Sequence, residues 1–310
     1  MSNRVSRGSM TCARRTWTTL DDEVFPYSVW ESASQPPRAI IVAVHGLSGA
    51  ALDYEPLGSH LCGEGVTTYA IELRGQGNDP VAARRGDLAA LEKWYGDLRA
   101  FFCLVRGQHT RTPVYYYGES MGAALLTRFL ALADKSEQPA GLILASPVVL
   151  VPGNPTWLRL AVFRFCHFIA PRRRVDVSQY TRRRDANDPK YWVTRDAAHR
   201  QWFETASHRI TSFTFRFFKC HFDLLSGCME AAPGIAVPVL VIYASNDVYI
   251  SPAEVEKFVE RLGSREKEAQ LFPEAYHLLL HDLDKNQALE RIERWLRDRL
   301  SKNGPRHADD

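Results

Sequence analysis

One serine in the sequence lies in a setting that could make it a nucleophile. Ser120 is the central residue of Gly118-Glu119-Ser120-Met121-Gly122, which directly follows the apolar run VYYY and precedes AALL. A strand, a sharp turn and a helix in this order are typical of a nucleophile elbow, which presents the serine hydroxyl at the edge of a sheet. The glycines fit because the turn backbone approaches neighbouring elements closely. A glycine-rich turn with an incidental serine would have the same composition.

A serine hydroxyl alone is a weak nucleophile, so it needs a base and a group that orients the base. His277 and Asp247 each follow a predicted strand, and we expect them to be the base and the orienting carboxylate. The order Ser120, Asp247, His277 along the chain differs from the orders in chymotrypsin and subtilisin. Three other side chains could take these roles: His281 as the base, and Asp282 or Glu274 as the orienting group.

Fixed backbone amides can stabilise the negative charge that develops on the carbonyl oxygen during attack. The amide of Met121 directly follows the predicted nucleophile, and the amide of Leu47 lies in the loop HGLSG, which begins at His45 and Gly46 after an apolar strand. We therefore predict an oxyanion hole formed by Leu47 and Met121. His45 lies where the strand passes into this oxyanion loop, so we predict that it braces the loop by hydrogen bonds rather than acting as a base.

The elements that must position these residues alternate between strand and helix, which favours a parallel sheet with helices on both faces. After an edge hairpin within 14–33, the predicted strands are 39–44, 68–73, 113–117, 142–145 and 239–243. The predicted helices are 52–61, 87–105, 120–133, one that begins with a capping box at Ser251, and a last one with Leu289, Ile292 and Leu296 on one face.

A long segment, residues 151–236, interrupts this alternation and is too long for a plain connection. It holds 14 of the 34 aromatic residues, with 14 Arg or Lys and only 7 Asp or Glu. We predict a basic helical cap inserted after the sixth strand of the sheet. The predicted organisation is a flexible N-terminus (1–12), a core in two parts (13–150 and 237–303), the cap (151–236) and a flexible tail (304–310).

Two groups of cap aromatics bear on the substrate. Most of these side chains are expected to hold the cap helices on the core, and a few to face the nucleophile, which would favour an apolar acyl group. The first group is Trp157, Phe163, Phe165 and Phe168, and the second is Phe213, Phe215, Phe217, Phe218 and Phe222.

Composition limits the functional classes. The chain has 310 residues, 45% hydrophobic and 24% charged, which is ordinary for a globular protein. A net charge of +3 is too small for a dedicated nucleic-acid binder, and no apolar run reaches the roughly 20 residues that span a bilayer. The sequence favours a cytoplasmic protein, because its six cysteines form no C-x-x-C pair and its first segment lacks the apolar core of a secretory signal. The arginines near the N-terminus leave a transit peptide as an alternative.

Two Cys-His dipeptides, Cys166-His167 and Cys220-His221, raise the question of a zinc site. Adjacent residues on a helix point in different directions, and no second motif with metal-ligand spacing accompanies them. We therefore predict no metal and no cofactor. The cysteines are expected to act as small buried hydrophobic residues.

With these motifs the sequence resembles the α/β-hydrolase superfamily, and within it the branch of monoacylglycerol lipases, lysophospholipases and serine aminopeptidase-like hydrolases. The resemblance covers about residues 38–300 and rests on HG at His45, RGQG at Arg74, GESMG at Ser120, SNDVYISP at Asp247 and AYH at His277. The chain departs from the family in the oxyanion loop, which continues as LSGAA, and at Ala123, where a third glycine is frequent.

The resemblance implies an α/β-hydrolase fold and a serine esterase that cleaves monoacylglycerols, lysophospholipids or similar esters through an acyl-enzyme. An aminopeptidase on the same fold would need carboxylates in the cap for the free amine, and the cap's excess of arginine argues against it. An acyltransferase or a non-catalytic ligand-binding homologue would also fit this fold. The arginine runs 172–174 and 182–184 form either a solvated face or a weak contact with anionic membranes.

Overall fold

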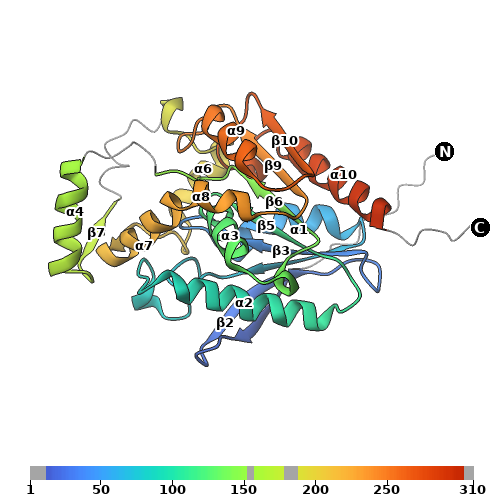
Figure 1. The fold of residues 1–310 in the computed structure, drawn as a ribbon, viewed down its shortest axis with the longest axis horizontal. Helices are drawn as coiled ribbons and strands as arrows, with labels where there is room; N and C mark the ends of the chain where they lie inside the picture. The colour runs from blue at the N-terminus through green and yellow to red at the C-terminus, as the bar shows by residue number, and fades with distance from the viewer. Residues whose placement is uncertain (1–11, 152–156, 178–187, 304–310) are drawn as a thin grey trace, which may run out of the picture.

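The computed structural model describes residues 12–151, 157–177 and 188–303, and its centre is an eight-stranded sheet in the order β1-β2-β4-β3-β5-β6-β9-β10 (Figure 1). β1 and β2 form an antiparallel edge hairpin, β2 pairs antiparallel with β4, and every other pair is parallel. The strands are β1 (Ala13–Thr18), β2 (Val24–Trp30), β3 (Ala39–Val44), β4 (Val66–Ile71), β5 (Val114–Glu119), β6 (Gly141–Ala145), β9 (Val239–Ala244) and β10 (Lys267–Phe272). The predicted fold class is confirmed.

Helices cover both faces of the sheet, and this explains why the central strands are apolar without interruption. Successive residues of β3 alternate between the two cores: Ile40, Val42 and Val44 join one, and Ile41 the other. One face is covered by α1 (Glu55–Cys62) and α10 (Lys285–Asn303), and the other by α2 (Leu91–Gln108), α3 (Met121–Leu132) and α9 (Pro252–Arg261).

Hydrogen bonds of the residues near each helix start determine where two of the helices begin. The capping box at Ser251 is confirmed, because its hydroxyl accepts from the amide of Glu254 while the Glu254 carboxylate accepts from the amide of Ser251. The prediction that α2 begins at Asp87 is wrong by four residues. The Asp87 carboxylate accepts bonds from Thr214 and Arg216 of the cap, so this stretch serves as a contact with the cap rather than as a helical turn.

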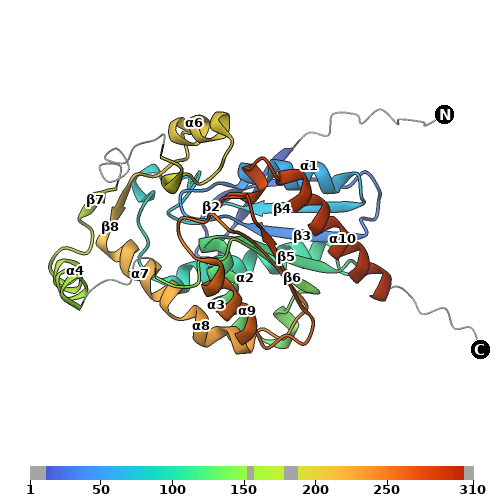
Figure 2. The ribbon, with the colours of Figure 1, turned by 90° about the horizontal axis from the view of Figure 1, so that it is seen from above.

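The cap between β6 and β9 is helical, as predicted, and adds a small antiparallel ribbon that the sequence did not reveal. Figure 2 shows α4 and α6 on the outside of the molecule, with α4 at the end farthest from α10. The cap elements are α4 (Trp157–Ile169), α6 (Ala197–Thr205), α7 (Phe215–Ser226) and α8 (Cys228–Ala231), with β7 (Arg174–Asp176) paired to β8 (Ser212–Thr214).

The cap aromatics divide by element. Phe213 and Phe217 are buried in the larger core cluster and hold the cap on the sheet domain, as expected. On α4, Phe163 packs against Phe215 of α7, whereas Phe165 and Phe168 are 62% and 85% exposed and do not hold the cap on the core. Within the described ranges, no helix is both long enough and apolar enough to cross a bilayer.

Candidate active site

Ser120 lies at the junction of β5 and α3, in a backbone conformation that non-glycine residues rarely adopt. Its φ is 55° and its ψ is −118°. Its amide donates to the carbonyl of Ala145 on the neighbouring strand at 3.0 Å, and its carbonyl accepts from the amide of Ala123 at 3.1 Å. These bonds hold a strained turn in place at the carboxyl edge of the sheet, where such strain is commonly part of a functional site.

The positions of the glycines around Ser120 leave no room for a side chain. A Cβ on Gly122 would overlap the carbonyl oxygen of Val44, and a Cβ on Gly118 would lie 2.8 Å from the backbone of Ala123. Gly46 faces Ser120 across the turn, and its Cβ would lie 3.0 Å from the Cβ of Ser120. The elbow and the oxyanion loop can approach this closely only because these residues have no side chain.

The oxyanion loop after β3 is braced from inside. The Nε2 atom of buried His45 accepts from the amide of Leu73 at 3.1 Å, and its Nδ1 lies 2.9 Å from the carbonyl of Gly46. These partners assign a neutral ring with the proton on Nδ1. Burial lowers the pKa of His45 to about 4. The side chain of Gln76, from the RGQG motif, accepts from the amide of Ser48 at 2.8 Å and fixes the far end of the loop.

Leu47 and Met121 both line a cavity that also holds Ser120. Among the described residues, neither the Leu47 amide nor the Met121 amide donates to another backbone or side-chain group. Both amides are therefore available to an oxygen atom at the nucleophile. The two side chains contribute apolar surface to the same cavity.

Asp247 and His277 meet beyond the ends of β9 and β10. The Nδ1 of His277 lies 2.7 Å from Oδ2 of Asp247. The side chain of His277 is only 4% exposed and that of Asp247 only 1%. Burial, the largest influence, lowers the pKa of His277, but the charge and hydrogen bond of Asp247 outweigh it and leave the pKa above its ordinary value. The arrangement holds the ring in one orientation with Nε2 free to exchange a proton.

The rival side chains are engaged elsewhere. Nε2 of His281 lies 2.8 Å from the carbonyl of Asp53, and burial lowers the pKa of His281 to about 3. The buried carboxylate of Asp282 accepts from the amide and guanidinium of Arg195 at 2.9 and 2.7 Å. Glu274 is exposed. Of the carboxylates considered, Asp247 is the one that contacts a candidate base.

The cavity above Ser120 has a volume of about 650 Å³ and is bounded by the oxyanion loop, the elbow, the loops after β9 and β10, and the cap. Ser120 and His277 both line it, and in the described part of the chain no hydrogen bond joins their side chains. Its apolar wall consists of Leu47, Met121, Val148, Val177, Val193, Phe203, Ile210, Phe213, Phe218, Val248 and Leu278.

Several polar groups in the cavity were not found by sequence reasoning. Burial raises the pKa of Asp53 to about 8 and that of Glu119 to about 7, the latter against the lowering effect of His277. Arg209 and His221 come from the cap and also line the cavity. Glu119 carried a signal because it lies in the elbow motif, and His221 was noted only as part of a Cys-His dipeptide. Asp53 and Arg209 belong to no motif and reach the site through the tertiary fold.

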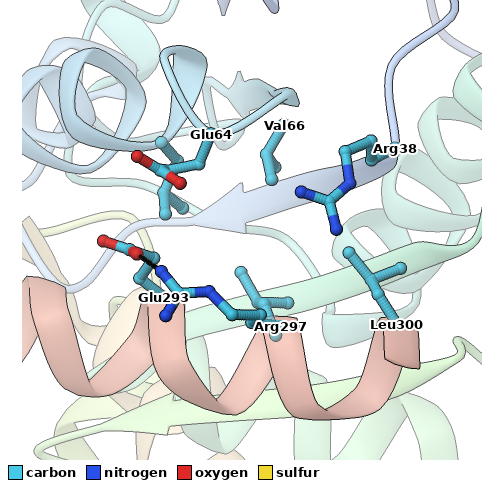
Figure 3. Close-up of a pocket in the computed structure, with 8 residues that line it drawn as sticks. Arg38, Glu64, Val66, Glu293, Arg297 and Leu300 are labelled. Carbon is cyan, nitrogen blue, oxygen red and sulfur yellow. Dashed lines mark hydrogen bonds and ion pairs between the residues drawn. The ribbon is translucent and has the colours of Figure 1, made fainter. Parts of the chain in front are cut away.

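A second hollow, drawn in Figure 3, lies between α1 and α10 at the amino ends of β3 and β4. Its volume is about 20 Å³, roughly that of a single water site, so it cannot hold an organic substrate. Glu293 and Arg297 form an ion pair at its rim. Because ligands of parallel α/β sheets bind at the carboxyl ends of the strands, the larger cavity is the candidate active site.

The Cys-His dipeptides do not come together as a metal site. Cys220 is buried and its thiol donates to the carbonyl of Leu88, while the next residue, His221, lines the cavity. Cys166 and His167 lie on α4. Within the described ranges, no group of three or more His, Cys, Asp or Glu side chains is arranged to hold a metal ion.

The chain is similar to known proteins in sequence and in fold. Residues 35–284 match the family described as serine aminopeptidase, S33. A monoacylglycerol lipase of Mycolicibacterium smegmatis is 22% identical over 281 residues, covering 87% of this chain and 91% of that protein. An uncharacterized abhydrolase domain-containing protein of Dictyostelium discoideum is 22% identical over 94% of this chain, which spans only 30% of that protein's length.

Among solved structures, a soluble variant of monoglyceride lipase from Saccharomyces cerevisiae in complex with a substrate analog superposes with a TM-score of 0.79. The match covers 94% of this chain and 96% of that one at 19% sequence identity. At this identity the likeness establishes the fold.

Proposed function

Because the chain belongs to the serine aminopeptidase S33 family of α/β hydrolases, we propose that it hydrolyses carboxylic esters of apolar acyl groups, such as monoacylglycerols or lysophospholipids, through an acyl-enzyme. The single observation that carries this proposal is the placement of Ser120, His277 and the Leu47 and Met121 amides around one largely apolar cavity. The similarity to a monoacylglycerol lipase over most of both chains supports the ester class.

In the acylation step, Nε2 of His277 removes the hydroxyl proton of Ser120 as the oxygen attacks the ester carbonyl. Asp247 holds the proton-bearing Nδ1 and stabilises the charged ring. The amides of Leu47 and Met121 donate to the oxyanion of the tetrahedral intermediate; loss of one such donor typically raises the barrier by about 2.7 to 4 kcal/mol. His277 then gives its proton to the leaving alcohol.

In the deacylation step, His277 takes a proton from water, and the resulting hydroxide attacks the acyl carbonyl on Ser120. Collapse of the second tetrahedral intermediate releases the acid and returns the proton to Ser120. Asp247 keeps the pKa of His277 above its ordinary value despite burial, which favours transfer of a proton to the ring in both steps.

The apolar wall supports an acyl group of some length. Phe213 and Phe218 from the cap line the cavity together with Met121 and Leu47 from the core. Specific pockets for small molecules are mostly apolar with a few fixed polar groups, as here. The cap thereby contributes part of the surface that an acyl chain would contact.

Replacing Ser120 by alanine tests this function. Ser120→Ala should abolish turnover of p-nitrophenyl butyrate while leaving the thermal unfolding midpoint close to that of the parent, because it removes a single hydroxyl. Ser226→Ala, at an exposed serine of α7, is the matched control and should retain full activity. Turnover by Ser120→Ala at the parent rate would remove Ser120 from the mechanism.

The basic cap remains a candidate for contact with anionic membranes. Arg172 and Arg173 are exposed beside α4, whereas Arg174 donates to the carbonyls of Ala83 and Arg85 and so holds the cap on the core. Residues 182–184 lie outside the described residues. Each exposed cation near an anionic surface contributes about 1 kcal/mol. Co-sedimentation with vesicles should therefore increase with anionic lipid content, and indifference to that content would dismiss the contact.

A further inference from the structure

The cap places one arginine at the cavity beside the oxyanion loop. Arg209 lies between α6 and β8, and the carbonyl of the next residue, Ile210, accepts from the hydroxyl of Ser48 at 3.0 Å. This bond ties the arginine's segment to the loop that carries the predicted oxyanion donor Leu47. Arg209 is half-buried, lines the cavity, and has its guanidinium 5.1 Å from the ring of Phe203.

Arg209 differs in its partners from three other arginines that are at least partly buried. The guanidinium of Arg74 pairs with Asp97, that of Arg195 with Asp282, and that of Arg216 with Asp87. Among the described residues, no carboxylate pairs with Arg209. Withdrawing a charge from water without an opposite charge is costly, so buried charges are normally paired. A guanidinium on a cavity wall that no described carboxylate neutralises is therefore suited to an anion that enters the cavity.

The two carboxyl groups on the cavity wall, Asp53 and Glu119, carry less than their full negative charge at neutral pH. Burial raises the pKa of Asp53 to about 8 and that of Glu119 to about 7, so the first is mainly protonated and the second about half so. Burial lowers the pKa of the wall histidines His45 and His221 to about 4, and that of His281 to about 3, so these rings are neutral. The cavity is thus biased towards positive charge.

Resting on the proposed ester hydrolysis, we propose that the substrate carries an anionic group, a phosphate or a carboxylate, and that Arg209 binds it while Ser120 attacks the ester. The planar guanidinium can donate two parallel hydrogen bonds to either group. Arg209 and Ser120 line the same cavity, so a single ligand in it can contact both. Arg209 is then a determinant of specificity rather than a part of the bond-breaking machinery.

The test compares matched neutral and anionic substrates. One pair is 1-lauroylglycerol and 1-lauroylglycerol 3-phosphate, which differ on the alcohol side; the other is p-nitrophenyl butyrate and p-nitrophenyl hemiglutarate, which differ on the acyl side. We expect the parent to favour the anionic member of one pair in kcat/KM. Arg209→Gln should lower that kcat/KM by about 10- to 100-fold, as expected for a lost charged hydrogen bond, and change the neutral member by less than about twofold.

Arg209→Lys retains the positive charge but not the planar guanidinium, so its kcat/KM for the anionic substrate should fall less than that of Arg209→Gln. The control Arg164→Gln, at an exposed arginine of α4, should leave kcat/KM unchanged for both substrate pairs. Preference of the parent for the neutral member of both pairs would overturn the proposal, and so would equal losses on both members in Arg209→Gln. If Arg209→Gln does not fold, the parent's preferences and Arg209→Lys decide. Absence of hydrolysis of every ester by the parent would instead contradict the proposed function.

Discussion

Ser120 owes its partly accessible, strained position to neighbours that have no side chain. Gly122 approaches the end of β3 so closely that any Cβ would overlap the carbonyl of Val44. The strain at Ser120 is therefore maintained by close packing with the core of the sheet rather than by flexible surface contacts.

At this position Gly122→Ala should separate the elbow from β3. We expect a loss of at least about 2 kcal/mol in the free energy of unfolding, together with most of the esterase activity, because backbone rather than a flexible side chain must move. The control is Gly107→Ala, at an exposed site of α2 with no atom near the added Cβ, which should stabilise by about 0.5 to 1 kcal/mol. Equal stability of the two variants in chemical denaturation would contradict this account.

The pH dependence follows from the charge state of His277. The base must be neutral, and its pKa lies above 6.5, so kcat/KM should fall as the pH falls through that raised value. Asp247→Asn removes the charge that raises the pKa and leaves burial, which lowers it. Its residual activity should be lower by about 10⁴-fold, with the acid limb moved to lower pH. An acid limb at the parent's pH would exclude Asp247 as the partner of His277.

At the scale of elements, the cap holds the loop that carries His277. The carbonyl of Val193 accepts from the amide of Leu278 at 2.8 Å, and the hydroxyl of Thr194 donates to the carbonyl of His281 at 2.7 Å. Arg195 completes the contact through the buried carboxylate of Asp282. Asp282, a rival orienting group in the sequence, thus positions the loop instead of the imidazole.

Removing Arg195 should disturb this loop. Arg195→Ala leaves the Asp282 carboxylate buried without its guanidinium, which typically costs about 3 to 5 kcal/mol. We expect a lower unfolding midpoint and, at temperatures where the variant remains folded, a fall in kcat greater than the change in KM. Lys190→Ala, at an exposed cap residue, is the control. A stability loss with kcat unchanged would limit Arg195 to a structural role.

At the scale of the whole molecule, the sequence predicted features that depend on neighbouring residues and missed those that depend on contacts between residues far apart in the chain. Ser120, Asp247 and His277 lie in short motifs at strand ends, so local pattern and chain order are enough to propose them as catalytic residues. The capping box at Ser251 is equally local and is confirmed. Arg209 reaches the cavity only because the cap folds back over the oxyanion loop, an approach that no local pattern encodes.

The start of α2 was missed for the same reason, because Asp87 is held by Arg216, far along the chain. The four residues before Leu91 lie outside the helix, and the ion pair of Asp87 with Arg216 holds their start against the cap. Long-range contacts of the cap therefore account for the missed helix start and for Arg209, a cap residue of the site that was missed.

The size of the cavity leads to a prediction for the acyl chain. In a largely apolar cavity of about 650 Å³, each methylene added to the acyl chain should strengthen binding by up to about 0.8 kcal/mol until the cavity is filled. For p-nitrophenyl esters, kcat/KM should therefore rise from acetyl to medium-length acyl groups. A steady fall beyond acetyl would show that the cap closes off the apolar wall.

Covalent labelling tests the central claim most directly, because a fluorophosphonate reacts only with a serine that its surroundings have activated. The parent protein should take up one probe, and mass spectrometry of its peptides should place that probe on Ser120. The label should be lost in Ser120→Ala and strongly reduced in His277→Ala. A folded parent that stays unlabelled, or a probe attached to another serine, would contradict the account.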